Sequence, residues 1–225
     1  MIVLALDTAL AACSVGLFDT ERDKVLASES ALLHRGHAEA LLPMIERVIA
    51  KLEGGWTALS RIGVIVGPGS FTGLRVGIAA ARAAALATKR PAVGITTLAA
   101  LAAPAIAISE GSPVASVIDA RHSNVFFQLF SPEGRPLCEP AVLSADEVAA
   151  RLTEQPAHLV GSGSLAVRAA LSRLGVSARS YDADAMPDIV SLAKLAAAAN
   201  PVTAPATPLY IKAAAAEPMA VRPST

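Results

Sequence analysis

The chain repeats one plan of apolar runs in its two halves, and this repeat constrains the fold more than any other feature. Residues 2–18 contain two strand-like apolar runs, the first of which ends at Asp7. Residues 115–131 repeat the pattern, with Asp119 at the corresponding position. Each half therefore predicts a β-hairpin whose first strand ends at an aspartate.

A glycine turn is repeated in the same order. VGPGS at 66–70 returns as VGSGS at 160–164, each time between an apolar run and a helix-like stretch. The pattern predicts a strand, a tight turn and a helix. Repetition of both the hairpin and the glycine turn indicates duplication of an α/β unit. We expect a first lobe over residues 1–108 with the partner-binding helices, a second, smaller lobe over residues 109–212, and a flexible tail over residues 213–225.

The first glycine turn has two interpretations. Backbone N–H groups at the start of a helix attract phosphate or carboxylate oxygens, so Asp7, Gly67, Gly69, Ser70 and Asp119 are candidates for an anion or nucleotide loop. The turn lacks the lysine of a Walker loop and the glycine spacing of a dinucleotide fingerprint. The alternative is a tight turn whose glycines allow close packing, with Ser70 as a helix N-cap and both aspartates closing turns, the role that we favour for them.

Composition excludes several classes of protein. The formal net charge is zero, which gives no overall attraction to nucleic acid. Two distant cysteines make neither a disulfide framework nor a zinc site. No apolar run is long enough to span a membrane and no basic leader precedes the first run, so we expect a cytoplasmic protein. The interval 54–109 contains no acid but five basic residues, which either attract phosphates or acidic partner groups or are simply solvated: Arg61, Arg75, Arg82, Lys89 and Arg90.

Two predicted helices carry more apolar surface than one sheet needs. They cover residues 37–52 and 70–87, and small residues on the second helix permit close helix packing. The surplus predicts a partner interface, whereas an intramolecular core is the alternative for each single residue. The candidate interface residues are Leu41, Leu42, Ile45, Phe71, Leu74, Ile78 and Ala81.

Five motifs together resemble the TsaB (YeaZ) family of bacterial tRNA threonylcarbamoyladenosine biosynthesis proteins. They are LALDTA at 4–9, HRGHAEALLP at 34–43, GPGSFTGLRVG at 67–77, DARHSNVFFQLF at 119–130 and PLYIK at 208–212. The resemblance covers nearly the whole chain. It implies an α/β fold of two duplicated actin-like (ribonuclease H-like) lobes, the second one reduced, in the superfamily of actin, Hsp70 and sugar kinases.

The same resemblance implies a non-catalytic scaffold or activating subunit. In the family, the two helices bind the related subunit TsaD as a helical bundle, or a second TsaB copy when the protein is alone. With TsaE, this machinery forms N6-threonylcarbamoyladenosine in the anticodon loop of tRNAs that read ANN codons, so contact with tRNA would be indirect. Thr97 and Leu101 stand where the catalytic relative has two metal-binding histidines, which implies no metal and no cofactor here. The alternative function is a small nucleotide-binding kinase or ATPase that uses Asp7, the glycine loop and Asp119.

Overall fold

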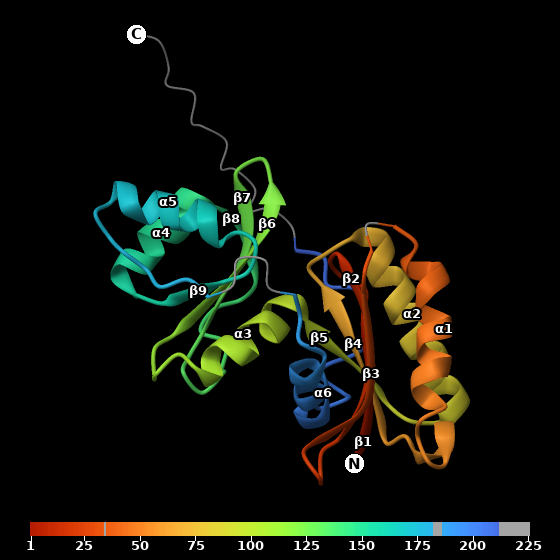
Figure 1. Cartoon of the computed structure of the whole chain (residues 1–225). Helices are drawn as coiled ribbons and strands as arrows, with labels where there is room; N and C mark the ends of the chain where they lie inside the picture. The colour runs from red at the N-terminus through yellow and green to blue at the C-terminus, as the bar shows by residue number, and fades with distance from the viewer. Residues whose placement is uncertain (34, 182–185, 212–225) are drawn as a thin grey trace.

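A computed structural model describes residues 1–33, 35–181 and 186–211, so the expected tail over residues 213–225 lies outside the described residues. The first lobe is built on one sheet with the strand order β3-β2-β1-β4-β5 (Figure 1). β1 is antiparallel to β2, as the hairpin pattern predicted, and parallel to β4. The strands are β1 Ile2–Asp7, β2 Ala12–Asp19, β3 Lys24–Leu32, β4 Arg61–Gly67 and β5 Ala92–Thr96.

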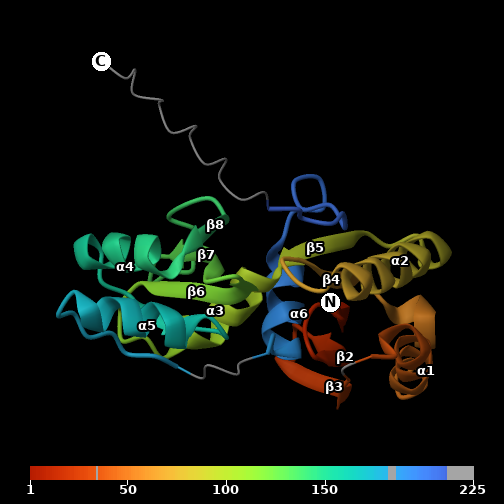
Figure 2. The same ribbon diagram turned by 90° about the horizontal axis from the view of Figure 1, so that it is seen from above.

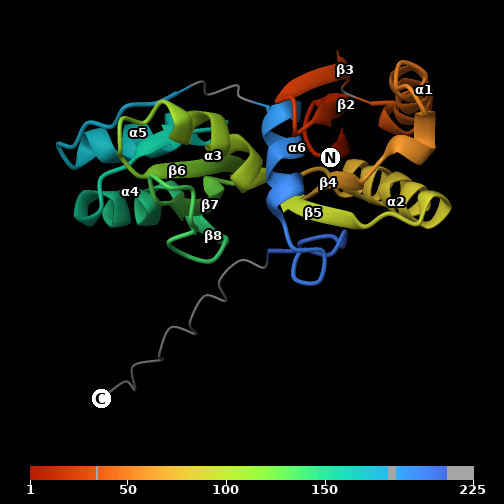
Figure 3. The same cartoon turned by 90° about the horizontal axis from the view of Figure 1, so that it is seen from below.

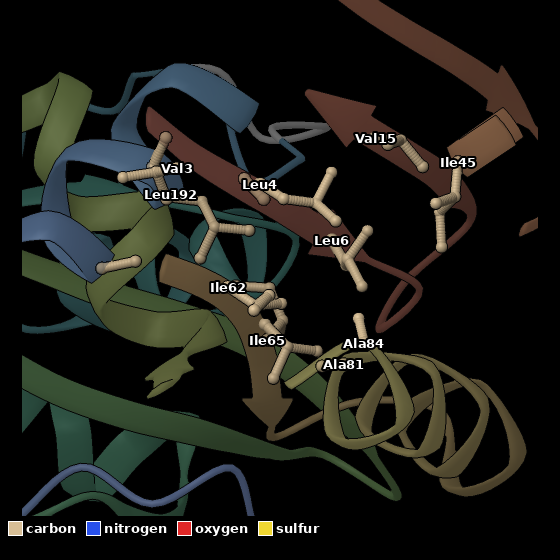
Figure 4. Close-up of a cluster of buried hydrophobic side chains, with 14 of the residues drawn as sticks. Val3, Leu4, Leu6, Val15, Ile45, Ile62, Ile65, Ala81, Ala84 and Leu192 are labelled. Carbon is tan, nitrogen blue, oxygen red and sulfur yellow. The ribbon is translucent and has the colours of Figure 1, made fainter. Parts of the chain in front are cut away.

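Helices cover both faces of this sheet. α1, His37–Ile49, and α2, Phe71–Thr88, pack on one face, and a short 3-10 helix, Gly55–Ala58, follows α1. α6, Ile189–Ala198, packs on the other face. Because β1 side chains alternate between faces, Leu4 and Leu6 meet α1 and α2 while Val3 meets Leu192 of α6 (Figure 4). The result is a continuous apolar core on both sides of β1.

Small residues let α6 approach the sheet closely. Ala5 lies between Gly16 on β2 and Gly63 on β4, so the three form a row across the sheet. A Cβ at Gly63 would lie 2.4 Å from the Cβ of Ala196, and one at Gly16 would lie 2.8 Å from Ile189. These glycines are therefore required by the packing of α6 rather than by a turn.

The second lobe repeats the plan with a smaller sheet of order β8-β7-β6-β9. β6 is antiparallel to β7 and parallel to β9, which matches β1, β2 and β4. Next to β9, Ser180 makes only a single β-bridge, at the position that β5 occupies in the first lobe. The elements are β6 Val114–Arg121, β7 Asn124–Phe130, β8 Ala141–Ser144, β9 His158–Val160, α4 Ala145–Glu154 and α5 Ser164–Arg173.

Two helices lie between the sheets (Figures 2 and 3). α3, Thr97–Ala107, packs its apolar face against β6 and β7 of the second lobe and also contacts α6. α6 was expected to belong to the second lobe, within 109–212, but it packs on the first sheet. The first lobe is thus completed by a helix from the carboxyl-terminal part of the chain. None of the helices in the described residues is long and apolar enough to cross a membrane.

Candidate functional site

The first glycine turn packs against the turn between β1 and β2. A Cβ at Gly69 would lie 2.5 Å from the carbonyl oxygen of Ala9, and one at Gly73 would lie 2.0 Å from the carbonyl oxygen of Thr8. The Ala9 carbonyl accepts a hydrogen bond of 2.7 Å from the Ser70 N–H. Gly67 has a φ of 118°, which favours glycine. The chain itself therefore occupies much of the space beside these glycines, as the close-packing interpretation predicted.

Ser70 caps the start of α2, in agreement with the sequence interpretation. Its Oγ accepts a hydrogen bond of 3.3 Å from the Gly73 N–H. The Thr8 hydroxyl donates to the Gly73 carbonyl at 2.7 Å, which ties the β1–β2 turn to the first turn of α2. These bonds use two donors that an anion would otherwise contact, the Gly73 N–H and the Thr8 hydroxyl.

Asp7 is fully buried at the end of β1. Its Oδ1 accepts a hydrogen bond of 2.8 Å from the Ala9 N–H, the turn-closing role that the sequence favoured. Its Oδ2 has no hydrogen-bond partner among the residues that the structure describes. Burial raises the pKa of the carboxyl to about 7, although the bond from Ala9 opposes this rise. Asp7 is therefore a largely neutral group near pH 6, not an exposed metal ligand.

Asp119 is exposed and lies in a pocket between the lobes. Its Oδ1 accepts a hydrogen bond of 2.8 Å from the Arg121 N–H, and its own N–H donates to the Ser162 Oγ at 3.0 Å. The inter-lobe pocket has a volume of about 550 Å³ and is also lined by Gly69 and Ser70. Asp7 does not line it. Of the five candidate residues, the structure thus brings three to one pocket, whereas Asp7 and Gly67 are buried and do not line it.

Thr97 and Leu101 lie in the core rather than at an open site. The Thr97 hydroxyl is buried and donates a hydrogen bond of 2.6 Å to the Pro68 carbonyl. Leu101 packs with the apolar residues between α3 and the second sheet. Neither side chain offers a free ligand atom. In the described part of the chain, no three His, Cys, Asp or Glu side chains cluster to hold a metal ion.

Five of the seven candidate interface residues belong to the core of the first lobe, which corrects their assignment to a partner surface. They are buried between the sheet and the two helices, although Ile45 also lines a groove between α1 and α2: Leu41, Ile45, Leu74, Ile78 and Ala81. Leu42 and Phe71 are the two exposed members, with exposed fractions of 58% and 56%. The periodic apolar pattern did not distinguish the core face from the outer face.

The outer face of the same helices forms an apolar groove. Its lining residues were not predicted as a group from the sequence. This α1–α2 groove has a volume of about 380 Å³, and Leu42 of α1 and Trp56 line it on one side. Ala80, Ala83 and Ala87 of α2 line the other side. The signal was present in the sequence as alanines spaced three and four apart, one turn of helix each.

The five basic residues of the acid-free interval do not form one surface. Arg61 is partly buried, and its Nη1 donates to the carbonyl oxygens of Ala196, Ala197 and Ala199 at 2.8, 2.9 and 2.6 Å. Arg61 therefore satisfies the carboxyl end of α6 instead of attracting a phosphate. Arg75 and Arg82 remain exposed on α2.

Comparison with known proteins agrees with this architecture. The family model described as TsaD, tRNA N6-adenosine threonylcarbamoyltransferase, matches residues 28–217. A solved structure of YeaZ from Pseudomonas aeruginosa superposes with a TM-score of 0.75 at 30% identity and covers 93% of this chain and 99% of that chain. The expected α/β fold with two actin-like lobes is confirmed.

Relatives named tRNA threonylcarbamoyladenosine biosynthesis protein TsaB are similar over shorter segments. The Escherichia coli protein is 35% identical over 127 residues, which are 56% of this chain and only 54% of that protein. The Haemophilus influenzae protein is 32% identical over 172 residues, 72% of each chain. From the family-model match, these identities and the superposition, the chain belongs to the TsaB (YeaZ) family.

Proposed function

We infer that this protein is a non-catalytic scaffold or activating subunit in the formation of N6-threonylcarbamoyladenosine in tRNA. It acts by docking a TsaD subunit through the α1–α2 groove, so that two homologous lobes meet as a helical bundle. The family membership supports the pathway, and the groove supports the docking mode. In this role the chain contributes binding energy and no reacting group.

The α1–α2 groove is the observation that carries the proposal. Leu42 and Trp56 are 58% and 39% exposed, although both are large and apolar. The alanines opposite them have short side chains, which lets a partner helix approach closely. An exposed apolar groove of this kind is typical of a protein interface. Covering it would remove the apolar area from water and stabilise the complex.

The buried state of the candidate catalytic groups supports a non-catalytic role. Thr97 and Leu101 are core residues at the positions where the resemblance places the histidines of the catalytic relative. Asp7 is sealed in the core by the β1–β2 turn. Transfer of the threonylcarbamoyl group would therefore be performed by TsaD, and this chain would reach tRNA through its partner.

The other partners follow from the same groove. A second copy of the chain would use it when TsaD is absent, so homodimer and heterodimer would compete for one surface. TsaE would join the assembly once TsaD is bound. We assign this work to the cytoplasm, as the sequence analysis expected.

Isothermal titration calorimetry with TsaD from the same cell tests the docking surface. Ala83→Glu places a charge in the exposed groove without entering the core, and we expect it to weaken binding more than about tenfold. Leu165→Glu is the matched control, because Leu165 is 65% exposed on α5 of the second lobe and should leave binding unchanged. Equal affinity for both variants and the unaltered protein would contradict the proposed surface.

A nucleotide-binding kinase or ATPase remains the second candidate, because the inter-lobe pocket contains Asp119 beside Ser70. The core position of Asp7 weighs against it, since the proposed pair of acids does not face one pocket. Magnesium-dependent ATP turnover by the isolated protein that is lost in Asp119→Asn would favour this function. No turnover would favour the docking subunit.

A further inference from the structure

Phe71 and Tyr210 form an exposed aromatic pair at the start of α2. Phe71 is the first residue of the helix, and Tyr210 follows Leu209, whose N–H donates to the Val66 carbonyl at 2.8 Å. The ring centroids are 6.1 Å apart, and the rings are 56% and 58% exposed. The Arg75 guanidinium carbon lies 3.7 Å from the Phe71 ring centroid. We call Phe71, Arg75 and Tyr210 the Phe71 platform.

One pocket borders this platform and a second pocket adjoins the first, and each is lined by an exposed arginine. The inter-lobe pocket is lined by Phe71 and Arg121. A second pocket of about 480 Å³ is lined by Arg35, and both pockets share Ser70 and Thr72 at the start of α2. Two acids also line these pockets, Glu39 in the second and Asp119 in the inter-lobe pocket.

The charges around the platform favour an anionic ligand. Within the described residues, neither Arg35, Arg75 nor Arg121 forms an ion pair with an acid. The three arginines outnumber the two pocket acids, Glu39 and Asp119, and no acid occurs on α2 itself. Aromatic faces with arginines on either side are the features that bind unpaired bases and their phosphates in single-stranded nucleic acids.

A protein partner is less well matched to the platform than to the α1–α2 groove. The groove is lined mainly by apolar residues, with Glu46 and Thr88 as its polar members. The pockets beside the platform are lined by charged residues of both signs and by hydroxyl groups. Phe71 also lies more than two helical turns from Ala80, the first groove residue of α2. The two surfaces could therefore be occupied at the same time.

We propose that the Phe71 platform binds an unpaired nucleobase of RNA, with the adjacent phosphates held by Arg35 and Arg121. The choice of RNA rests on the proposed function, since a free nucleotide offers the same base and phosphate chemistry. The platform thus gives this subunit a direct contact with the tRNA loop, in addition to the indirect contact through TsaD.

Fluorescence anisotropy with the full chain tests this site. The probe is a labelled anticodon stem-loop of a tRNA that reads ANN codons, and a blunt duplex of the same stem is the comparison RNA. Loss of one stacked base predicts that Phe71→Ala weakens loop binding by about 5- to 100-fold. Phe71→Tyr should retain binding. Arg168→Ala, a control on α5 that removes one exposed positive charge far from the platform residues in sequence, should change binding less than about twofold because it removes no contact at the platform.

Several results would overturn the proposal. They are no loop binding by the unaltered chain, equal binding by Phe71→Ala, or equal binding of the blunt duplex. Displacement of the RNA by AMP at the same concentration as unlabelled stem-loop would assign the site to free nucleotides instead. Loss of TsaD affinity in Phe71→Ala without loss of RNA affinity would assign it to protein docking.

Different variants test TsaD docking at the α1–α2 groove and RNA binding at the Phe71 platform, so one proposal can be wrong while the other holds. Ala83→Glu should lose TsaD and keep the RNA, whereas Phe71→Ala should do the reverse. An unchanged thermal unfolding midpoint in Phe71→Ala would show that the lobe stays folded, as the exposure of Phe71 predicts.

Discussion

Replacing Asp7 by Asn should change how the stability of the protein depends on pH. Asp7 is fully buried, and its Oδ2 has no hydrogen-bond partner among the described residues. Asn is nearly isosteric, and its Oδ1 can still accept the 2.8 Å bond from the Ala9 N–H. The substitution therefore removes a titrating group and leaves the turn intact.

The magnitude follows from the shift in pKa. Burial raises the pKa of Asp7 from 3.8 to about 7, so the folded state holds the proton to a higher pH than the unfolded state does. This contribution to stability is fully present below about pH 4 and is lost as pH rises through about 7. The total loss is about 4 kcal/mol, of which about 3 kcal/mol falls between pH 5 and pH 8.

Urea unfolding followed by circular dichroism at pH 5 and pH 8 measures this loss. Other groups titrate in both proteins, so the quantity of interest is the difference between the unaltered chain and Asp7→Asn at each pH. We expect the variant to gain about 3 kcal/mol relative to the unaltered chain between the two pH values. The same difference at both pH values would refute a raised pKa and with it the assignment of Asp7 to the core.

Two further predictions test the packing of α6. Gly63→Ala should lower the free energy of unfolding by about 1–3 kcal/mol, because its Cβ would overlap that of Ala196. Adding Ala196→Gly should restore part of the loss. An unchanged urea midpoint in Gly63→Ala would contradict this packing. Arg61→Met should speed hydrogen exchange at the α6 amides relative to Arg168→Met, since the helix loses the guanidinium that binds its last carbonyls. Identical exchange in the two variants would show that Arg61 is not a cap.

Much of the architecture was predictable because each repeated unit is formed by residues that are close together in the sequence. Each hairpin is encoded by adjacent apolar runs, and each glycine turn by residues next to the helix that it starts. The Ser70 cap and the turn-closing bond to Asp7 are short-range contacts of two or three residues, and both were predicted. The reduced second sheet agrees with the expected smaller lobe.

The placement of α6 and the outer groove depended on long-range packing. The apolar face of α6 fits either sheet by composition, and only the row of small residues formed by Gly16, Ala5 and Gly63 selects the first sheet. Similarly, apolar residues at helical spacing on α2 predicted an interface at Ile78 and Ala81, which are buried. A charge at either residue would test folding rather than docking, so the groove residue Ala83 is the better position.

In the proposed function, this chain supports threonylcarbamoyl transfer to tRNA without performing it. Reconstituted transfer, with TsaD and TsaE present and this chain added or omitted, tests this role. We expect full transfer only when both this chain and TsaD are present, and loss of transfer with Ala83→Glu but not with Leu165→Glu. Transfer by this chain without TsaD, or full transfer by TsaD and TsaE alone, would contradict it.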